Sequence, residues 1–501
     1  MKRFLAILLA ALMVMALIPA MAEDEFPDHI EIEISMWELD GFGNDPIGQF
    51  LEEKFNCDIV NVLQEWSDYQ EKFALLATAD TLPDSFAGDP LSEAWFSQFV
   101  ADELIRPIPL EMIEKYPTLY AMCQSSTEWQ LCNDMYDGVI YYIPRMLSAS
   151  GAVKGTRDAL LYRKDWAETV GITEAPTDMD ALLTMLTAFA KNDPDADGSD
   201  NTFGLVGSYT PLYYAFGAYP DRWVNVEDGV TYGWLDKEPM VKALTWLRTA
   251  YENGAIDPEM SNDRTKWASG THGAFLCGAA DAYWLNRYLD EEMAGAYPDK
   301  GDPLDYVGMV AAFSETAGAP AHKALDTDTS GTVFAYDTTD EQVDRLLAIY
   351  DYLLTDEGNM LRYWGIEGED YEYQDGKPVK ITDEVLRTKY PSIFIQNWPS
   401  WDHDFLMDVE NGDPTIRPEI KELAIAGRTA SNDAADFEKI NLLAGYMPSE
   451  EKRDFVFDID AELAGIITGT EDVEAMYDTL VEKAKANGVE DVVASINALL
   501  G

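Results

Sequence analysis

The sequence is poor in three residue types, and each scarcity limits what the protein can do. Its 501 residues include only 4 His, 4 Cys and 35 Lys+Arg, set against 92 Asp+Glu, for a formal net charge of -57. Because phosphate binding needs clustered Lys and Arg, this charge excludes a nucleic-acid partner and disfavours an anionic membrane surface. The acidic excess favours solubility, a monomer and attraction of cations.

Common catalytic motifs are also absent. The chain has no P-loop, dinucleotide fingerprint, zinc-protease motif or nucleophile elbow. The four histidines (29, 272, 322 and 403) are scattered without ligand spacing, so each is expected to be a surface or hydrogen-bonded residue. A chain with 92 acids can always supply a pair of carboxylates, so such a pair neither supports nor excludes glycoside hydrolysis. A secreted glycoside hydrolase therefore remains the enzymatic alternative.

The four cysteines, at positions 57, 123, 132 and 277, include no CxxC pair. A zinc or thioredoxin-type site therefore has no support. Cys123 and Cys132 are close enough in sequence to bridge a local loop in an exported protein. The alternative is four buried thiols, and the sequence leaves both open.

The only long apolar run lies at the start of the chain. Lys2 and Arg3 precede apolar residues 4–18, and residues 20–22 (AMA) have the form of a cleavage site. This pattern predicts a secretory signal peptide over residues 1–22, because the run is short for a bilayer-spanning helix. No Cys precedes Cys57, so we expect a secreted protein without a lipid anchor, in a periplasm or at the cell exterior.

The remaining chain has the composition and patterning of a globular α/β protein. Hydrophobic residues make up 47% and aromatic residues 12%. The N-terminal part predicts the order β-α-β-α-β, which indicates a parallel sheet covered by helices. The predicted strands are 30–36, 57–62, 138–144, 159–163, 203–206, 307–312 and 332–336. The predicted helices are 50–55, 69–78, 178–191, 240–251 and 343–354, with further helix at the C-terminal end.

An acidic loop after the helix at 178–191 resembles a calcium-binding loop. Asp193, Asp195, Asp197, Ser199 and Asn201 occupy positions 1, 3, 5, 7 and 9 of an EF-hand-like pattern. Hard oxygen ligands in a tight turn suit Ca²⁺. The expected ligands are the side chains of Asp193, Asp195, Asp197 and Asn201 and the backbone carbonyl of Ser199. The alternative is an acidic turn.

The loop departs from the EF-hand pattern at its last position. Gly204 stands where a bidentate Glu is usual, so Thr202, Asp200 or water would complete the site. A strand is predicted directly after the loop, which favours a structural calcium clip over a sensor.

Tryptophan is abundant, and several of its 13 copies adjoin loop-forming residues. A sugar ring stacks its apolar face on an aromatic plane and needs carboxylates, amides and Arg for its hydroxyls. Tryptophans in such surroundings are Trp37, Trp284, Trp364, Trp398 and Trp401. Each alone is more often a core residue, but as a set they favour a sugar site.

Several blocks of sequence, in order, resemble one known family. These are LEEKFNCDIVNV, EKFALLATADTLPDSFAGD, DGVIYYIP, the segment from ALLYRKDW to the acidic loop, and the GIEGxxYE phrase at 365–372. They resemble the bacterial extracellular solute-binding proteins of family 1, the group of maltose- and alginate-oligosaccharide-binding proteins, in its long lipoprotein-type branch. Members of this branch usually carry a lipid-attached Cys, which is missing here.

The resemblance implies a two-lobed, type II periplasmic-binding-protein fold, with each lobe a sheet flanked by helices and a cleft between them. The first lobe would hold residues 23–145 and about 311–355, and the second about 146–310 and about 356–501, with the calcium loop at 193–204 in the second. Such a protein captures an oligosaccharide and delivers it to the permease subunits of an ABC importer without catalysis. A peptide or another small solute is the alternative ligand.

Carried over by position, the resemblance places ligand contacts at strand ends, at the crossing between lobes and in the GIEG loop. Arg163, Trp284 and Glu367 have the best-matching surroundings, whereas Trp398 and Trp401 are proposed from composition. The full set is Trp37, Glu38, Asp89, Arg163, Trp284, Asn286, Arg287, Trp364, Glu367, Tyr371, Trp398 and Trp401. The net charge favours neutral glycans over uronates, unless Arg163 and Arg287 form a positive pocket.

Overall fold

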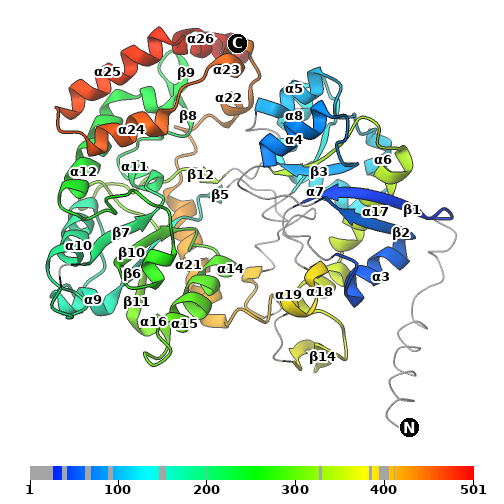
Figure 1. The fold of residues 1–501 in the computed structure, drawn as a ribbon, viewed down its shortest axis with the longest axis horizontal. Helices are drawn as coiled ribbons and strands as arrows, with labels where there is room; N and C mark the ends of the chain where they lie inside the picture. The colour runs from blue at the N-terminus through cyan, green and yellow to red at the C-terminus, as the bar shows by residue number, and fades with distance from the viewer. Residues whose placement is uncertain are drawn as a thin grey trace.

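In the computed structural model, the chain folds into two lobes (Figure 1). The described residues are 26–36, 42–62, 69–88, 94–145, 154–199, 201–326, 330–382, 386–393, 406–410 and 412–501. The predicted signal peptide lies outside them. In each lobe helices flank a central sheet, which confirms the predicted two-lobed α/β fold. Within these ranges, no helix has both the length and the apolar character needed to cross a bilayer.

The first lobe is built on a five-stranded sheet in the order β2-β1-β3-β13-β4. Its strands are β1 (Ile30–Ser35), β2 (Cys57–Asn61), β3 (Ser85–Gly88), β4 (Tyr142–Pro144) and β13 (Gly331–Phe334). β1 runs parallel to β2 and β3, as predicted, whereas β13 is antiparallel to both β3 and β4. In β1, Ile32 and Ile34 are buried and Glu31 and Glu33 are exposed, because successive side chains point to opposite faces.

Local capping fixes the ends of the first-lobe helices. The Asp45 side chain accepts hydrogen bonds from the backbone N–H groups of Ile47 and Gly48 at the start of α3. Thr339 and Gln342 form a capping box at the start of α17. The helices and one hairpin are α3 (Pro46–Phe55), α4 (Tyr69–Thr78), α5 (Ala94–Ala101), α6 (Leu110–Glu114), α7 (Pro117–Ser125), α8 (Thr127–Met135), α17 (Asp340–Leu353), α18 (Asp356–Trp364), β14 (Tyr371–Gln374), β15 (Lys377–Lys380) and α19 (Leu386–Lys389).

The second lobe is built on a four-stranded sheet in the order β11-β6-β10-β7. Its strands are β6 (Ala159–Arg163), β7 (Phe203–Gly207), β10 (His272–Cys277) and β11 (Val307–Val310). β7 and β10 are parallel, and β6 runs antiparallel to both β10 and β11. All five side chains of β6 are buried, because helices cover both faces of the sheet.

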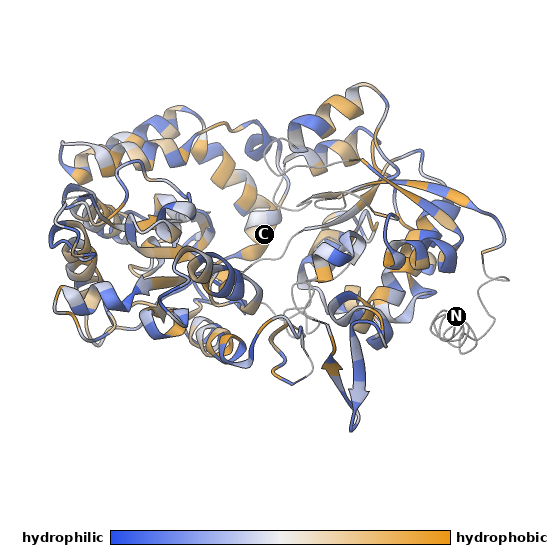
Figure 2. Cartoon of the chain, turned by 60° about the horizontal axis from the view of Figure 1, so that its bottom comes forward, coloured by the Kyte–Doolittle hydropathy of each residue, from blue (hydrophilic) through white to orange (hydrophobic). Residues whose placement is uncertain are grey.

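Amphipathic helices surround this second sheet, and Figure 2 shows hydrophobic and hydrophilic residues mixed along the helices of both lobes. α10 (Met179–Lys191) buries the predicted apolar stripe of Leu182, Met185, Leu186 and Phe189. The other elements are α9 (Lys164–Thr169), α11 (Thr210–Tyr214), β8 (Trp223–Val226), β9 (Gly229–Tyr232), α12 (Lys237–Glu252), α13 (Thr265–Ala268), α14 (Ala282–Asn286), a π-helix (Arg287–Met293), α15 (Ala294–Ala296), α16 (Pro303–Tyr306), α21 (Pro418–Ala434), α22 (Leu442–Tyr446), α23 (Glu450–Asp454), α24 (Ile459–Thr468), α25 (Val473–Ala486) and α26 (Val489–Leu500).

The chain passes between the lobes three times. It leaves the first lobe after β4, returns before β13, and leaves again between α19 and α21. Beside the first two passages, β5 (Lys154–Gly155) and β12 (Leu325–Asp326) form a small antiparallel sheet. The buried Lys323 reinforces it, because its Nζ donates to the Thr156 carbonyl at 3.0 Å.

The packing of two segments differs from the predicted division of the chain between the two lobes. Phe313 packs in a core of the second lobe, and Leu325 joins a smaller second-lobe cluster with Tyr214. Leu386 and Tyr390, by contrast, pack in the core of the first lobe. We therefore propose that the first lobe comprises residues 26–145 and 330–393, and the second residues 154–326 and 406–501.

The short helix α22 contacts both lobes. Ala444 packs in a second-lobe cluster with Trp223, whereas Tyr446 is buried in the first-lobe core and Leu442 is half-buried against it. Residues 442 and 446 lie one helical turn apart and share a face. Burial, Cys132, Glu128 and Tyr446 raise the pKa of Tyr142 well above its usual value, which places Tyr446 near β4. α22 is therefore a noncovalent link between the lobes beside the crossings.

The four cysteines are free and buried, so Cys123 and Cys132 do not form the disulfide that the sequence left open. Burial raises the pKa of Cys57 and of Cys132 to about 12. These thiols are therefore protonated and unreactive at neutral pH.

Replacing Tyr446 with Ala tests the link through α22. We expect a loss of about 3 kcal/mol in the free energy of unfolding, because a buried aromatic side chain is removed. Because this side chain joins the lobes, calorimetry should also show their unfolding transitions moving apart. Tyr446→Phe, which keeps the ring, should retain the wild-type profile. An unchanged profile for Tyr446→Ala would contradict the link.

Candidate functional site

The carboxyl ends of the parallel strands in the first sheet form one edge. β1 and β3 end there at Ser35 and Gly88. Gly331, at the start of β13, pairs with both Gly88 and Pro144, so both neighbouring passages between the lobes also leave from this edge. The carboxyl edge of the first sheet therefore points toward the second lobe.

The second sheet turns its corresponding edge to the same place. β7 and β10 end at Gly207 and Cys277, and Ala159, where the chain enters β6, pairs with Cys277. The chain reaches Ala159 directly from the crossing at β5. The carboxyl ends of β7 and β10 thus lie at the junction of the lobes, the position where open α/β sheets bind ligands.

Helix α14 follows β10 at this junction and carries two of the predicted ligand residues, and a third, Arg287, begins the π-helix that continues it. Asp281 caps the helix by accepting a hydrogen bond from the backbone N–H of Trp284 at 3.0 Å. Trp284 is half-buried, stacked on Tyr288 at 5.9 Å between ring centroids, with the Arg287 guanidinium 5.5 Å from its ring centroid. The buried side-chain oxygen of Asn286 accepts no hydrogen bond from the described residues. Trp284 is therefore a half-buried aromatic surface with neighbouring ring and cation contacts.

Trp284 also belongs to an apolar cluster that spans the lobes. Leu406, from the third passage, is 2% exposed and packs with Tyr283 and Trp284 of the second lobe and Tyr363 of α18 in the first. The surroundings of Trp284 thus depend on the relative position of the lobes. The sequence did not single out Leu406, Tyr283 or Tyr363, because these residues are distant from one another along the chain.

Arg163 lies elsewhere. It ends β6, and because β6 runs antiparallel to β10, that end is at the sheet edge away from the other lobe. Its side chain is buried, bonds Asp165 with two hydrogen bonds of 2.7 and 2.8 Å, and has the Tyr297 ring centroid 4.8 Å from its guanidinium. These described contacts lie within the second lobe.

Trp364, Glu367 and Tyr371 lie together in the first lobe. Trp364 and Tyr371 are buried and pack edge to face with ring centroids 5.8 Å apart. Glu367 and Tyr371 line a pocket of about 520 Å³ whose lining comes from the first lobe alone. The structure therefore groups the GIEG residues with one another and does not bring them to Trp284.

The remaining predicted ligand residues lie outside the described residues. They are Trp37, Glu38, Asp89, Trp398 and Trp401. In sequence, the first three directly follow β1 and β3, and the last two belong to the third passage between the lobes. Their contacts stay a prediction.

The predicted calcium loop brings its carboxylates together. One oxygen each of Asp193, Asp195 and Asp197 lies within 4.8 Å of the others. The backbone N–H groups of Asp197 and Gly198 donate to Asp193, each at 3.1 Å, and Asn201 Nδ2 donates to Asp197 at 3.2 Å. Partial burial, the hydrogen bond with Asp193 and the charge of Asp197 raise the pKa of Asp195. A divalent cation would relieve this repulsion, so the residues present fit calcium.

The structure also explains the missing twelfth ligand. Gly204 lies inside β7, and a Cβ there would come within 2.2 Å of the Ala255 carbonyl oxygen. No side chain fits, so this position cannot supply a Glu. The loop precedes β7 and thus lies at the amino edge of the sheet, opposite the junction of the lobes. A cation there would fix the second lobe and not touch a ligand at the junction.

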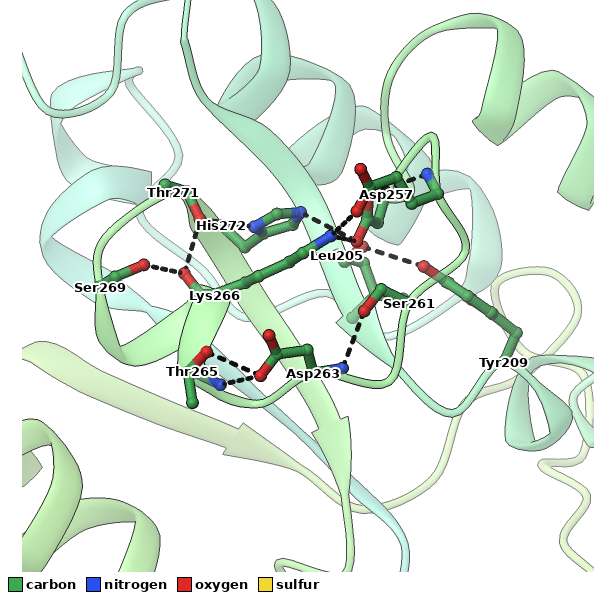
Figure 3. A network of polar contacts seen from close by, with 11 residues as sticks. Leu205, Tyr209, Asp257, Ser261, Asp263, Thr265, Lys266, Ser269, Thr271 and His272 are labelled. Atoms are coloured by element: carbon green, nitrogen blue, oxygen red, sulfur yellow. Dashed lines mark hydrogen bonds and ion pairs between the residues drawn. The ribbon is translucent and has the colours of Figure 1, made fainter.

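A polar network around the buried His272 and Asp257 lies at the same amino edge (Figure 3). His272 begins β10, stacks on Phe203 and contacts Thr271 Oγ1 through Nδ1 at 2.9 Å. Its Nε2 is 3.8 Å from Asp257, which Lys266 bonds at 2.7 Å. Burial lowers the pKa of His272 to about 4, in spite of the nearby Asp257 charge. His272 is therefore a neutral, buried residue.

Two α/β lobes that turn their strand ends to each other across three chain passages form the architecture of a solute-binding protein. The chain belongs to this class: the model of the family "Bacterial extracellular solute-binding protein" matches residues 47–326, more than half of its length. The family predicted from the sequence is thus confirmed.

Particular relatives agree with this assignment. Lipoprotein LipO of Bacillus subtilis is 24% identical over 327 residues, covering 62% of this chain and 61% of LipO. The polygalacturonan/rhamnogalacturonan-binding protein YtcQ of the same species is 24% identical over 284 residues, covering 53% of this chain and 52% of YtcQ. The matches thus span about half to three-fifths of these curated relatives.

Solved structures match over nearly the whole chain. The Streptococcus pneumoniae substrate-binding protein FusA, in complex with kestose, superposes with a TM-score of 0.71 at 17% identity, covering 94% of this chain and 98% of FusA. The alginate-binding protein AlgQ2, described without calcium ion, gives 0.68 at 18% identity, covering 95% and 98%. These likenesses establish the fold.

The buried His272 predicts a loss of stability in mild acid. Its pKa in the folded protein is about 4, below the usual 6.5, so the unfolded chain binds a proton first and stability falls between these values. Between pH 7 and about pH 5, this residue should cost about 2 kcal/mol of unfolding free energy. Denaturant titrations of His272→Gln should lack this component. His322→Gln, at a half-exposed histidine, should behave as wild type. Equal acid sensitivity in both variants would contradict the assignment.

Proposed function

We propose that the chain is a noncatalytic, extracytoplasmic receptor that captures an oligosaccharide between its lobes and delivers it to an ABC importer. The observation that carries this proposal is the junction itself. The parallel strands of both sheets present their carboxyl ends there, beside the half-buried Trp284 on α14. Such an edge is where α/β sheets bind small ligands, and Trp284 supplies the aromatic plane on which a sugar stacks.

The names of similar proteins support a carbohydrate ligand. FusA is described in complex with kestose, AlgQ2 as alginate-binding, and YtcQ as binding polygalacturonan and rhamnogalacturonan. All are named as binding proteins, and their family is named extracellular. We infer the same class of ligand and location for this chain, with the importer's permease subunits as partners.

The binding mechanism we propose is a shift between open and closed arrangements of the lobes. A ligand that contacts both lobes favours the closed form by the contacts made only there. The second-lobe contacts are Trp284, with Asn286 and Arg287 beside it, and Leu406 couples this surface to Tyr363 of the first lobe. Trp37, Glu38, Asp89, Trp398 and Trp401 are proposed as further contacts from their sequence positions.

The buried predicted residues have different proposed parts. Arg163 and Trp364 are enclosed within single lobes, so we assign them to support of the fold. The acidic surface keeps the receptor soluble and favours neutral or cationic glycans over uronates. Because Arg163 lies at the far edge of the sheet, we do not assign it to a positive pocket with Arg287.

Testing the proposal requires a panel of plant and host oligosaccharides with the wild-type protein. We expect at least one glycan to raise the melting temperature and to be recovered intact, because a receptor binds without turnover. Hydrolysis of any glycan would contradict the receptor and favour a glycosidase. No stabilisation by any glycan, with stabilisation by peptides, would favour the alternative ligand.

Replacing Trp284 with Ala tests the proposed sugar platform. Calorimetric affinity for the stabilising glycan should fall about tenfold, because the stacking surface is lost. Tyr336 is a matched control, since it is 56% exposed and follows the opposite end of the first sheet. Tyr336→Ala should bind as wild type. Equal affinities for Trp284→Ala and wild type would remove Trp284 from the site.

We further propose that the loop at 193–201 binds a structural calcium ion. Asp193, Asp195, Asp197 and Asn201 would supply side-chain oxygens and Ser199 its carbonyl, with Asp200 or water completing the shell. A second FusA structure is described as an EF-hand mutant, and the AlgQ2 structure as lacking calcium, which supports an ion in this family.

Calcium should stabilise the wild-type protein and not the Asp195→Asn variant. Saturating Ca²⁺, at about 100 times the dissociation constant, would add about 2.7 kcal/mol to the unfolding free energy. Chelator should reverse the effect. Asp375→Asn is the matched control, because Asp375 is an exposed turn acid in the β14–β15 hairpin. A calcium effect that is absent in wild type, or retained in Asp195→Asn, would contradict the site.

A further inference from the structure

The first lobe contains a pocket whose chemistry differs from that of a sugar site. It has a volume of about 520 Å³ and lies between α3, the end of α17, α18 and the β14–β15 hairpin. Figure 1 shows α18 and β14 low in the first lobe, with α3 alongside. All lining residues come from the first lobe, so closing the lobes on a ligand does not create this pocket.

The walls of the pocket are aromatic and aliphatic. Phe50 and Tyr352 form one side, with ring centroids 6.1 Å apart, and Tyr371 and Tyr373 another, 5.6 Å apart. Ile47, only 1% exposed, also lines it. These walls fit an apolar body, and the charged groups among the described lining residues are all carboxylates.

The rim is acidic: none of the described residues that line the pocket is Lys, Arg or His, although Lys54 lies over two of the lining rings. Asp356, Glu357 and Glu367 are exposed carboxylates in the lining, and Glu357 also accepts a hydrogen bond from Tyr352 at 3.0 Å. Burial, Tyr373 and then Glu367 raise the pKa of Tyr371, which agrees with a negative environment. A positively charged group at the rim would be attracted to these acids.

One cation of the chain already uses these aromatic rings. Lys54 Nζ, from α3, lies 4.5 Å from the centroid of Tyr352 and 5.7 Å from that of Phe50. Aromatic faces attract cations through their quadrupole, most strongly where water is partly excluded. Because Lys54 would repel a second cation from these rings, an ammonium group that enters from solvent is expected among the rim carboxylates.

We propose that this first-lobe pocket binds an organic cation with an apolar body, such as an arylalkyl amine or the free amino terminus of an apolar peptide. The apolar body lies against Ile47, Phe50 and Tyr371, and the ammonium group lies at the rim among the three carboxylates. Because the pocket belongs to one lobe, the amine binds whether or not a glycan holds the lobes together. This second site is independent of the proposed function.

A series of isosteric probes tests the proposal on the full protein. Phenethylamine, 2-phenylethanol and 3-phenylpropionate share an aromatic body and differ in charge. In ligand-observed NMR titrations at low salt, the amine should bind about tenfold more tightly than the alcohol, and the carboxylate least. High salt should weaken the binding of the amine and leave the binding of the alcohol unchanged, because salt screens the exposed carboxylates. Equal affinities for the amine and the alcohol, or no amine binding, would overturn the proposal.

Matched variants locate the binding. Glu357→Gln removes a rim charge. It should lower the affinity for the amine severalfold and leave the affinity for the alcohol unchanged. Glu369→Gln removes an exposed acid of the turn after α18 that is not among the described lining residues, and should not change the affinity of either probe. Tyr373→Leu removes a half-exposed ring and should weaken both probes. If Glu369→Gln and Glu357→Gln had the same effect, the binding would reflect net charge and not this pocket.

A peptide arm separates the two sources of the cation. A Phe-Phe amide, with a free amino terminus, should compete with phenethylamine if the pocket takes peptides. Its N-acetylated form should not compete, because the charge is absent. Failure of both peptides would restrict the ligand to small amines and support that form of the proposal. Competition by the acetylated peptide as strongly as by the free one would contradict a cation site.

Discussion

The insertion of β13 between β3 and β4 determines the architecture of the protein. This strand pairs antiparallel with both neighbours, and its residues are buried. Thr332 adds a hydrogen bond of 3.0 Å to Tyr350 of α17, which ties the following helix to the same core. Burying side chains such as Val333 and Phe334 stabilises the strand by about 1.5–3 kcal/mol each. The chain must therefore return from the second lobe to complete the first, and the first lobe cannot be one continuous segment.

The direction of the strands then separates two kinds of chemistry in the second lobe. β7 and β10 run toward the junction of the lobes, so their carboxyl ends and α14 face the other lobe. Their amino ends, at Phe203 and His272, lie beside the acidic loop and the buried network of Asp257 and Lys266. The proposed ligand surface and the proposed calcium loop thus lie at opposite edges of one sheet.

Patterns within short segments gave reliable expectations for the fold. Alternating apolar residues located β1, and the apolar stripe of α10 matches the structure residue by residue. The spacing of Asp193, Asp195 and Asp197 predicted their convergence, because those positions share one tight turn. These features depend on neighbours within a few positions, where backbone geometry alone decides which side chains meet.

Features that depend on strand direction or on contacts between distant residues were harder to predict from the sequence. Arg163 was expected beside the crossing, but β6 is antiparallel, and its carboxyl end therefore lies at the far edge of the sheet. The division between lobes followed the family pattern, whereas Leu386 and Tyr390 pack in the first-lobe core. The cluster of Leu406, Tyr283 and Tyr363 could not be foreseen, because no periodicity connects residues so far apart.

By itself, the sequence determined the α/β class, the excess of acidic over basic residues, the acidic loop and the family resemblance. Only the tertiary structure decided which strand ends face the other lobe, that α22 joins the two lobes, and that the GIEG residues line a separate apolar pocket. The physical reason is that composition and local periodicity act along the chain. Strand direction and burial depend on which surfaces, distant in sequence, pack against each other and exclude water.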